Sequence, residues 1–268
     1  MREIDFSEQN RKILVIGGLF NDVEMSGEGH STIFSSKIGG AAYNVAFALS
    51  KMGFEVYFGT VYPENCYEKI YENNLKIFPL KYPSKKGIFL YKEKKIIGVE
   101  RTTRIKITSL LKDTLTEKKF SAFFSTFELG SDIVNDLSSI NADWKFLDPT
   151  PWFEGEKIID YEIFDYILPN RMEMNKIKRL PFEKSIVKDG TKGIFFNNNN
   201  FENKEIGVDK FGNGDLFDAI FISEIVSGEN TFDAIKTAMR GAVNFSISDK
   251  NFESFVLGIM QGKKENEA

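Results

Sequence analysis

A short segment around residue 212 combines two glycines, a carboxylate and the start of an apolar helix. It reads Phe211-Gly212-Asn213-Gly214-Asp215 and continues with apolar side chains at 217, 220, 221 and 225. That spacing is typical of a helix with one buried face. The N–H groups of a helix start attract anions, and glycine lets a ligand approach the backbone closely. A carboxylate beside an anion site is costly unless it accepts a proton, so the segment indicates a phosphoryl-transfer site.

Ordinary turn chemistry is the alternative for this segment, because the helix dipole alone favours Asp in a first helical turn. A second glycine-rich helix start, Gly39-Gly40-Ala41-Ala42-Tyr43-Asn44, lies far upstream. Apolar residues at 45, 48, 49 and 52 give it a core-facing stripe, and Gly53 is a suitable C-terminal stop. Asn44 falls in the first turn, where its amide either reaches a bound polyol or faces solvent.

Together, the two segments resemble the two signature motifs of the PfkB carbohydrate kinase (ribokinase-like) family. The first signature, Gly-Gly-x-x-x-Asn, is matched by Gly39, Gly40 and Asn44. The second, Asp-Thr-Thr-Gly-Ala-Gly-Asp-x-Phe, is matched by the segment from Asp209 to Phe217. The resemblance implies an α/β fold: one kinase domain over residues 1–268, with a three-layer α/β/α core, a mostly parallel sheet and a small β lid.

The resemblance also implies an ATP- and Mg²⁺-dependent kinase that phosphorylates a hydroxyl of a sugar or sugar derivative. Asp215 would be the general base, and the N–H groups of Gly212, Asn213 and Gly214 would hold the phosphoryl oxygens. The substrate would be bound by Asp22, Gly39, Gly40, Asn44 and, as in some members, Glu128. The nucleotide would lie against Asn170, Lys188, Gly190 and Gly193, with Glu173 positioning magnesium. A helix capping box is the alternative for Asn170 and Glu173, and a hairpin turn for residues 185–193.

Several positions depart from the family pattern. Lys210 and Phe211 replace the two threonines and Asn213 replaces the alanine, close to where the family binds its nucleotide and a monovalent cation. Phe20 stands where ribokinase-type enzymes hold an asparagine, so ribose is not the favoured substrate and an aromatic face would line the pocket. Two alternatives stay open: a nucleoside kinase of the same family, with Phe20 stacking on a base, and a sugar-sensing homologue with little or no catalysis.

Composition favours a folded cytoplasmic enzyme. The chain carries a net charge of −4 with 42% hydrophobic and 28% charged residues, which excludes a disordered protein. The charges are interspersed, so no nucleic-acid partner is expected. No apolar stretch approaches about 18 residues, so no membrane span is expected. The N-terminus lacks a signal-peptide core, and a single cysteine, Cys66, excludes an intramolecular disulfide and fits a reducing compartment.

Strand-like and helix-like segments alternate along the chain, which predicts a largely parallel sheet covered by helices. Candidate strands are 12–17, 55–60, 120–125, 144–148, 165–168, 185–188 and 193–196, and candidate helices are 41–52, 107–118, 130–139, 214–227 and 231–247. Ligands bind at the carboxyl ends of such strands, where Asp22, Asn170 and Gly190 would converge. Two regions, about 23–38 and 86–104, fall outside the alternation. The resemblance implies that they form the lid, which would exclude water. We expect that this lid can also pair with a second chain in a homodimer.

Overall fold

The structure is a computed structural model of the whole chain. It describes residues 11–60, 75–79, 87–92, 95–100, 118–130, 133, 137–150, 159–177, 179–202 and 210–266. The expected helices at 107–118 and 130–139 lie largely outside these residues, as does the end of the second lid region, 101–104.

The core is a six-stranded sheet in the order β10-β9-β8-β1-β4-β5. Every neighbouring pair in it is parallel. The strands are β1 (Lys12–Ile16), β4 (Glu55–Thr60), β5 (Lys76–Pro79), β8 (Phe120–Thr126), β9 (Ala142–Asp148) and β10 (Tyr166–Ile167). The mostly parallel sheet predicted from the sequence is therefore confirmed, and β5 is a strand that the sequence analysis did not anticipate.

Both faces of this sheet are buried, which explains why its strands read as continuous apolar runs. Along β1, Ile13 and Val15 belong to one hydrophobic cluster, while Leu14 and Ile16 belong to a second cluster on the opposite face. The first cluster lies under the helices α1, α6, α7 and α8, and the second is closed by segments between residues 127 and 180. The arrangement is the expected three-layer α/β/α core.

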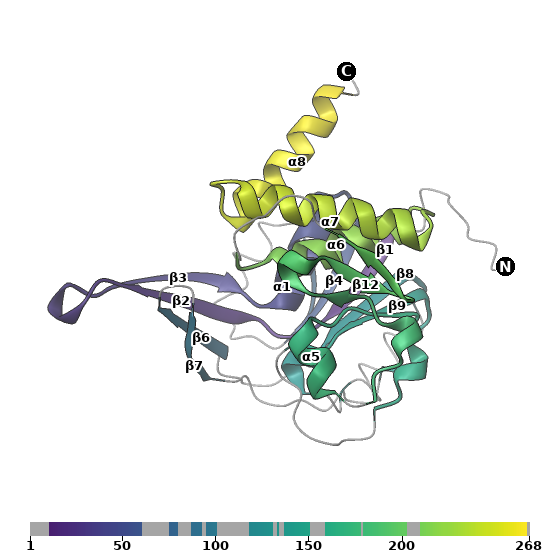
Figure 1. Cartoon of the computed structure of the whole chain (residues 1–268), viewed down its shortest axis with the longest axis horizontal. Helices are drawn as coiled ribbons and strands as arrows, with labels where there is room; N and C mark the ends of the chain where they lie inside the picture. Colours follow the sequence, from purple (N-terminus) through teal and green to yellow (C-terminus); the bar gives the residue numbers. More distant parts are fainter. Residues whose placement is uncertain are drawn as a thin grey trace.

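The helices on the first face follow the patterns seen in the sequence. They are α1 (Ala41–Lys51), α6 (Asn213–Val226), α7 (Thr231–Ile247) and α8 (Phe252–Asn266), and α5 (Arg171–Lys176) lies across the sheet from them (Figure 1). Short 3-10 helices span Gly29–Ser31, Phe127–Leu129, Tyr161–Ile163, Phe182–Lys184 and Gly190–Lys192. Helix α8, which was not predicted, begins directly beside the glycine turn that opens α6.

A separate four-stranded sheet, which we call the lid sheet, extends from the core in the order β3-β2-β6-β7 (Figure 1). It comprises β2 (Phe20–Ser26), β3 (Ile33–Gly39), β6 (Gly87–Lys92) and β7 (Lys95–Glu100). The pairs β2–β3 and β6–β7 are antiparallel hairpins. The two regions assigned to a lid therefore meet in one sheet, whose first strand carries Asp22 and whose second ends at Gly39.

A third sheet of β11 (Val187–Lys188), β12 (Ile194–Phe196) and β13 (Asn199–Phe201) is antiparallel. Parallel bridges from Ile167 to Ser185 and from Asn170 to Lys188 attach it beside β10. Lys188 is thereby placed at the carboxyl end of the central sheet. Among the described residues, no helix is long and apolar enough to span a membrane.

Candidate active site

The first turn of α6 has the geometry expected of an anion-binding helix start. Gly212 caps the helix with φ 91°, a conformation that favours glycine, and an added Cβ would lie 2.6 Å from Cδ2 of Phe252. The N–H of Asn213 donates to the Lys210 carbonyl at 3.1 Å and closes the turn, so the expectation that this N–H holds a phosphoryl oxygen was wrong. The N–H groups of Gly214 and Asp215 lie in the first helical turn, so they have no partner inside the helix.

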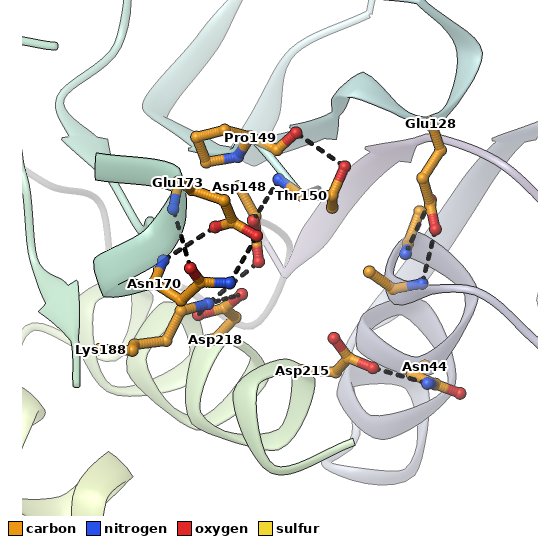
Figure 2. Close-up of polar contacts among 12 residues, drawn as sticks. Asn44, Glu128, Asp148, Pro149, Thr150, Asn170, Glu173, Lys188, Asp215 and Asp218 are labelled. Atoms are coloured by element: carbon orange, nitrogen blue, oxygen red, sulfur yellow. Dashed lines mark hydrogen bonds and ion pairs between the residues drawn. The ribbon is translucent and has the colours of Figure 1, made fainter. Parts of the chain in front are cut away.

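Asp215 lies against the second glycine-rich segment. Helix α1 begins after Gly40, whose φ is 106°, and Asn44 in its first turn donates from Nδ2 to Oδ2 of Asp215 at 2.6 Å (Figure 2). Burial raises the pKa of Asp215, the Asn44 hydrogen bond opposes that rise, and the charge of Asp148 adds to it. The two motifs, 171 residues apart, thus meet in one site.

Asp22 faces the same site from the lid sheet. Its carboxylate covers Gly39, where an added Cβ would lie 2.1 Å from Oδ2, so a larger residue there would displace the carboxylate. Its Oδ1 is buried without a hydrogen-bond partner in the protein. Burial raises the pKa of Asp22 to about 6, while the positive charge of Lys37, its cross-strand neighbour, lowers it and the charge of Asp215 raises it.

The carboxylate of Glu128 accepts hydrogen bonds from the protein backbone. Its Oε1 accepts the N–H of Ala41 at 2.7 Å, and its Oε2 accepts the N–H groups of Gly18 at 3.0 Å and Ala42 at 3.2 Å. The hydroxyl of Thr126 donates to the same Oε2 at 2.9 Å. Burial raises the pKa of Glu128 to about 7 despite these hydrogen bonds. Glu128 therefore holds the start of α1 in place, and its contact with substrate stays a prediction.

Phe20 does not line an open pocket, so that expectation was wrong. Its side chain is 1% exposed and belongs to the second hydrophobic cluster. The ring lies beside Gly18 and Gly40, where an added Cβ would meet it at 2.4 and 3.0 Å. Its role is to pack beneath the glycine-rich segments, and it offers no face for stacking on a base.

A buried charge cluster lies next to the start of α6. Lys188 donates from Nζ to Oδ1 and Oδ2 of Asp218 at 2.8 and 2.9 Å, and to Oδ2 of Asp148 at 3.0 Å (Figure 2). Burial alone would lower the pKa of Lys188, but the two carboxylates outweigh burial and raise it. The ammonium lies 3.6 Å from where a Cβ on Gly214 would stand, so a fixed cation borders the anion-binding turn.

Asn170 and Glu173 form the capping box that was the alternative interpretation, at the start of α5. The Glu173 N–H donates to Asn170 Oδ1 at 2.9 Å, while Glu173 Oε2 accepts the Asn170 N–H at 2.8 Å and Oε1 accepts its Nδ2 at 2.6 Å. Burial and the nearby charge of Asp148 raise the pKa of Glu173 to about 7. The capping box does not exclude the magnesium role, because the carboxylate still lies in the field of the same cluster.

The two predicted nucleotide-site glycines bound a short 3-10 helix after β11. Gly190 has φ 56° and Gly193 has φ 95°, and an added Cβ on Gly193 would lie 2.0 Å from the Phe201 carbonyl oxygen. Arg171 Nε lies 2.9 Å from Oδ2 of Asp189, the residue between Lys188 and Gly190. These contacts shape the turn that begins two residues beyond Lys188. That this turn contacts the nucleotide stays a prediction.

Sequence reasoning missed three members of the site: Asp148, Asp218 and Lys37. Asp148 ends β9 at the carboxyl edge of the sheet, a position that the sheet rule marks as functional. Asp218 follows Asp215 by three residues and so shares its helix face, which was a readable signal. Lys37 carried no signal in the sequence, because only the cross-strand register places it opposite Asp22.

No family model and no curated protein matches this sequence. Solved structures do match its fold over nearly its whole length. Ribokinase from Thermotoga maritima is 17% identical and covers 93% of this chain and 99% of its own, with a TM-score of 0.71. This chain has the ribokinase-like fold.

Two further solved structures with this fold are a ribokinase complexed with its ligands and a nucleoside kinase. Arabidopsis thaliana ribokinase, complexed with ribose and ATP, is 15% identical, with a TM-score of 0.66 over 94% of this chain and 99% of its own. Methanocaldococcus jannaschii nucleoside kinase is 16% identical, with a TM-score of 0.63 over 96% of this chain and 98% of its own. The ribokinase-like fold thus hosts acceptors of more than one class.

Proposed function

We propose that this chain is a kinase of the PfkB family that transfers the γ-phosphoryl group of ATP to a hydroxyl of a sugar or sugar derivative. The observation that carries the proposal is the hydrogen bond between Asn44 and Asp215, because it unites both glycine-rich motifs around one buried carboxylate. The ribokinase-like fold, with its carboxylates at the carboxyl ends of the strands, supports the same conclusion.

In this mechanism Asp215 accepts the proton of the acceptor hydroxyl as its oxygen attacks the γ-phosphorus. The bond from that phosphorus to the bridging β,γ-oxygen breaks, and ADP leaves. A raised pKa makes Asp215 a better base near neutral pH than an exposed aspartate. The backbone N–H groups of Gly214 and Asp215, with the Lys188 ammonium beside them, stabilise the charge on the transferred group.

The sugar would lie between Asp22 and Asp215. Asp22 presents a buried oxygen without a protein partner, and a substrate hydroxyl would satisfy that oxygen. Lys37 on the facing strand keeps part of the negative charge balanced. The lid sheet, which carries both residues, would cover the bound sugar and exclude water from the phosphoryl group.

Magnesium would be held largely through the nucleotide. Among the described residues, no group of three or more His, Cys, Asp or Glu side chains forms a metal cage. Mg²⁺ commonly binds through one or two carboxylates plus substrate phosphates and waters, and Glu173 beside Asp148 fits that pattern. The ion would neutralise charge on the β- and γ-phosphate oxygens.

The test is magnesium-dependent ADP release from ATP with a panel of hexoses, pentoses, nucleosides, polyols and fructosamines. We expect at least one sugar-class acceptor to stimulate release and to appear as a phosphorylated product. If nucleosides alone stimulate ADP release, the acceptor is a nucleoside and not a sugar. ATP binding without any stimulated release would favour the sugar-sensing alternative, and absence of ATP binding would contradict the proposal.

A further inference from the structure

The Lys210 side chain is enclosed by oxygen atoms from the end of α7 and the loop after it. Its Nζ lies 3.2 Å from the Phe245 carbonyl oxygen, 2.9 Å from the Ser248 carbonyl oxygen and 2.5 Å from the Lys250 carbonyl oxygen. The Ser248 hydroxyl is at 3.3 Å, and the Phe245 ring centroid is 4.3 Å away. We call these three carbonyls and the hydroxyl the oxygen cage.

The cage has the chemistry of a cation site. An ammonium group has three N–H donors and four oxygens surround Nζ, so at least one N–H is shared between two oxygens and the group is enclosed on several sides by acceptors. Carbonyl oxygens that replace a hydration shell are also how proteins bind potassium. Phe245 and Ser248 stand at the C-terminal end of α7, where the helix dipole favours positive charge. The Phe245 ring adds a cation–π contact.

The cage is joined to the anion-binding turn from two sides. The Lys210 carbonyl accepts the Asn213 N–H, so the residue that enters the cage also closes the turn before α6. Phe252, just past the cage, packs against Gly212 on the other side of that turn. A charge placed in the cage therefore fixes the backbone whose N–H groups face the transferred phosphoryl group.

We propose that Lys210 is a positioning residue that serves as a tethered monovalent cation. Its ammonium occupies the oxygen cage, holds the turn from Lys210 to Gly214 against the end of α7, and makes the site independent of dissolved cations. The role in turnover rests on the proposed kinase function, whereas the occupancy of the cage does not. An ordinary helix-capping lysine would also stabilise α7, but its loss would not be repaired by an ion of a particular size.

The test compares Lys210→Ala, which empties the cage, with Lys210→Met, which removes the charge but keeps an aliphatic chain in place. In lithium chloride both variants should lose about 100-fold in turnover, as expected for a displaced catalytic backbone. Potassium or ammonium chloride at the same ionic strength should restore Lys210→Ala but not Lys210→Met. The control is Lys236→Ala, an exposed lysine of α7 paired with Asp233, which should behave as wild type in every salt.

A second readout needs no substrate. The melting temperature of Lys210→Ala should be higher in potassium or ammonium than in lithium, because an ion bound only to the folded state stabilises it. Wild-type melting temperature should be the same in all these salts. If no acceptor is phosphorylated by the wild type, the proposed function fails and the melting temperatures alone decide the cage.

Three results would overturn the tethered cation. The first is a Lys210→Ala variant whose turnover or melting temperature ignores the identity of the cation. The second is full rescue of Lys210→Met by potassium. The third is a drop in wild-type turnover or melting temperature when potassium is replaced by N-methylglucamine. This result needs no variant, so it tests the proposal even if Lys210→Ala does not fold.

Discussion

Asp215 combines burial with a hydrogen bond from Asn44, and this sets how it works as a base. Burial raises its pKa above the ordinary value of 3.8. The carboxylate is thereby a stronger base than an exposed aspartate, but it loses its proton only at a higher pH. Both consequences follow from the same physical cause, so they can be tested together through pH.

We predict that kcat falls on the acid side at a pH above the ordinary aspartate range. The form that accepts the proton is the ionised one, so turnover decreases as pH drops through the raised pKa of Asp215. The measurement is kcat at saturating substrates from about pH 8 to about pH 4.5. A profile that stays flat over this whole range would contradict the buried base.

Substitution of Asp22 should weaken binding of the acceptor and leave ATP binding unchanged. Oδ1 of Asp22 is buried without a protein partner and the charge of Asp22 interacts with that of Asp215, so we predict that Asp22→Ala raises the KM for the acceptor by about tenfold or more. ATP affinity, measured by calorimetry, should not change. Glu229→Ala, which removes an exposed carboxylate between α6 and α7, is the control. A defect confined to ATP binding would remove Asp22 from the sugar site.

Helix α1, which carries Asn44, is held by a long-range contact rather than by a side-chain cap of its own. Helix α1 starts after Gly40, which offers no side-chain cap, and Glu128 from the segment after β8 supplies the missing acceptor. The same carboxylate also accepts the N–H of Gly18, two residues after the end of β1. One side chain therefore sets the position of Asn44 relative to the sheet.

We predict that Glu128→Gln lowers the free energy of unfolding by about 2–4 kcal/mol. The amide group would turn N–H donors toward backbone N–H groups that now meet a carboxylate, and buried donors would lose their partners. The measurement is urea unfolding at neutral pH. Glu162→Gln is the matched control, because that carboxylate is 74% exposed and pairs with Lys184. Equal stability of the two variants would mean that Glu128 is not the cap of α1.

At the same scale, the sequence predicted those elements whose pattern is local. Buried runs such as the strand predicted at 120–125 and the glycine-started helices α1 and α6 were predicted correctly to within a residue or two. Strand β2 was not among the candidate strands, because its alternation of polar and apolar residues is short, from Asp22 to Ser26, and follows the polar Asn21. The cluster around Lys188 was equally hidden. Its partners Asp148 and Asp218 are 40 and 30 residues away in sequence, and only tertiary packing joins them.

For the whole molecule, the site concentrates buried carboxyl groups whose pKa values are raised. Burial raises the pKa of Glu128 and of Glu173 to about 7 and that of Asp22 to about 6. In each case the folded state holds its proton more tightly than the unfolded chain. The stabilisation is complete below about pH 4 and is lost as pH rises through the folded-state values.

We therefore predict that the protein without ligands is less stable at about pH 8 than at about pH 5.5. A buried carboxyl group with a folded-state pKa of about 7, such as Glu128, contributes on the order of 2 kcal/mol to the difference, and Asp22 contributes less because its pKa is about 6. The measurement is the melting temperature at the two pH values. Magnesium with ATP should recover part of the loss at the higher pH, because cations offset the carboxylate charge. A melting temperature that rises with pH over this interval would contradict the raised pKa values.

The lid sheet also gives the molecule an exposed edge. Ile33 and Phe34 on β3 are 66% and 62% exposed, and β3 is an outer strand of its sheet. An exposed strand edge of this kind can pair with another chain. The homodimer through the lid stays a prediction, which sedimentation of wild type and a Phe34→Ser variant would check.

The central claim is that Asp215 removes the acceptor proton in a transfer from ATP. The most direct measurement is the turnover of Asp215→Asn beside its ATP affinity, with the wild type and Glu229→Gln as references. The substitution keeps the size of the side chain but leaves no group to accept the proton. We predict that turnover falls about 1,000-fold while ATP affinity and melting temperature stay near wild type. Wild-type turnover in Asp215→Asn would contradict the account.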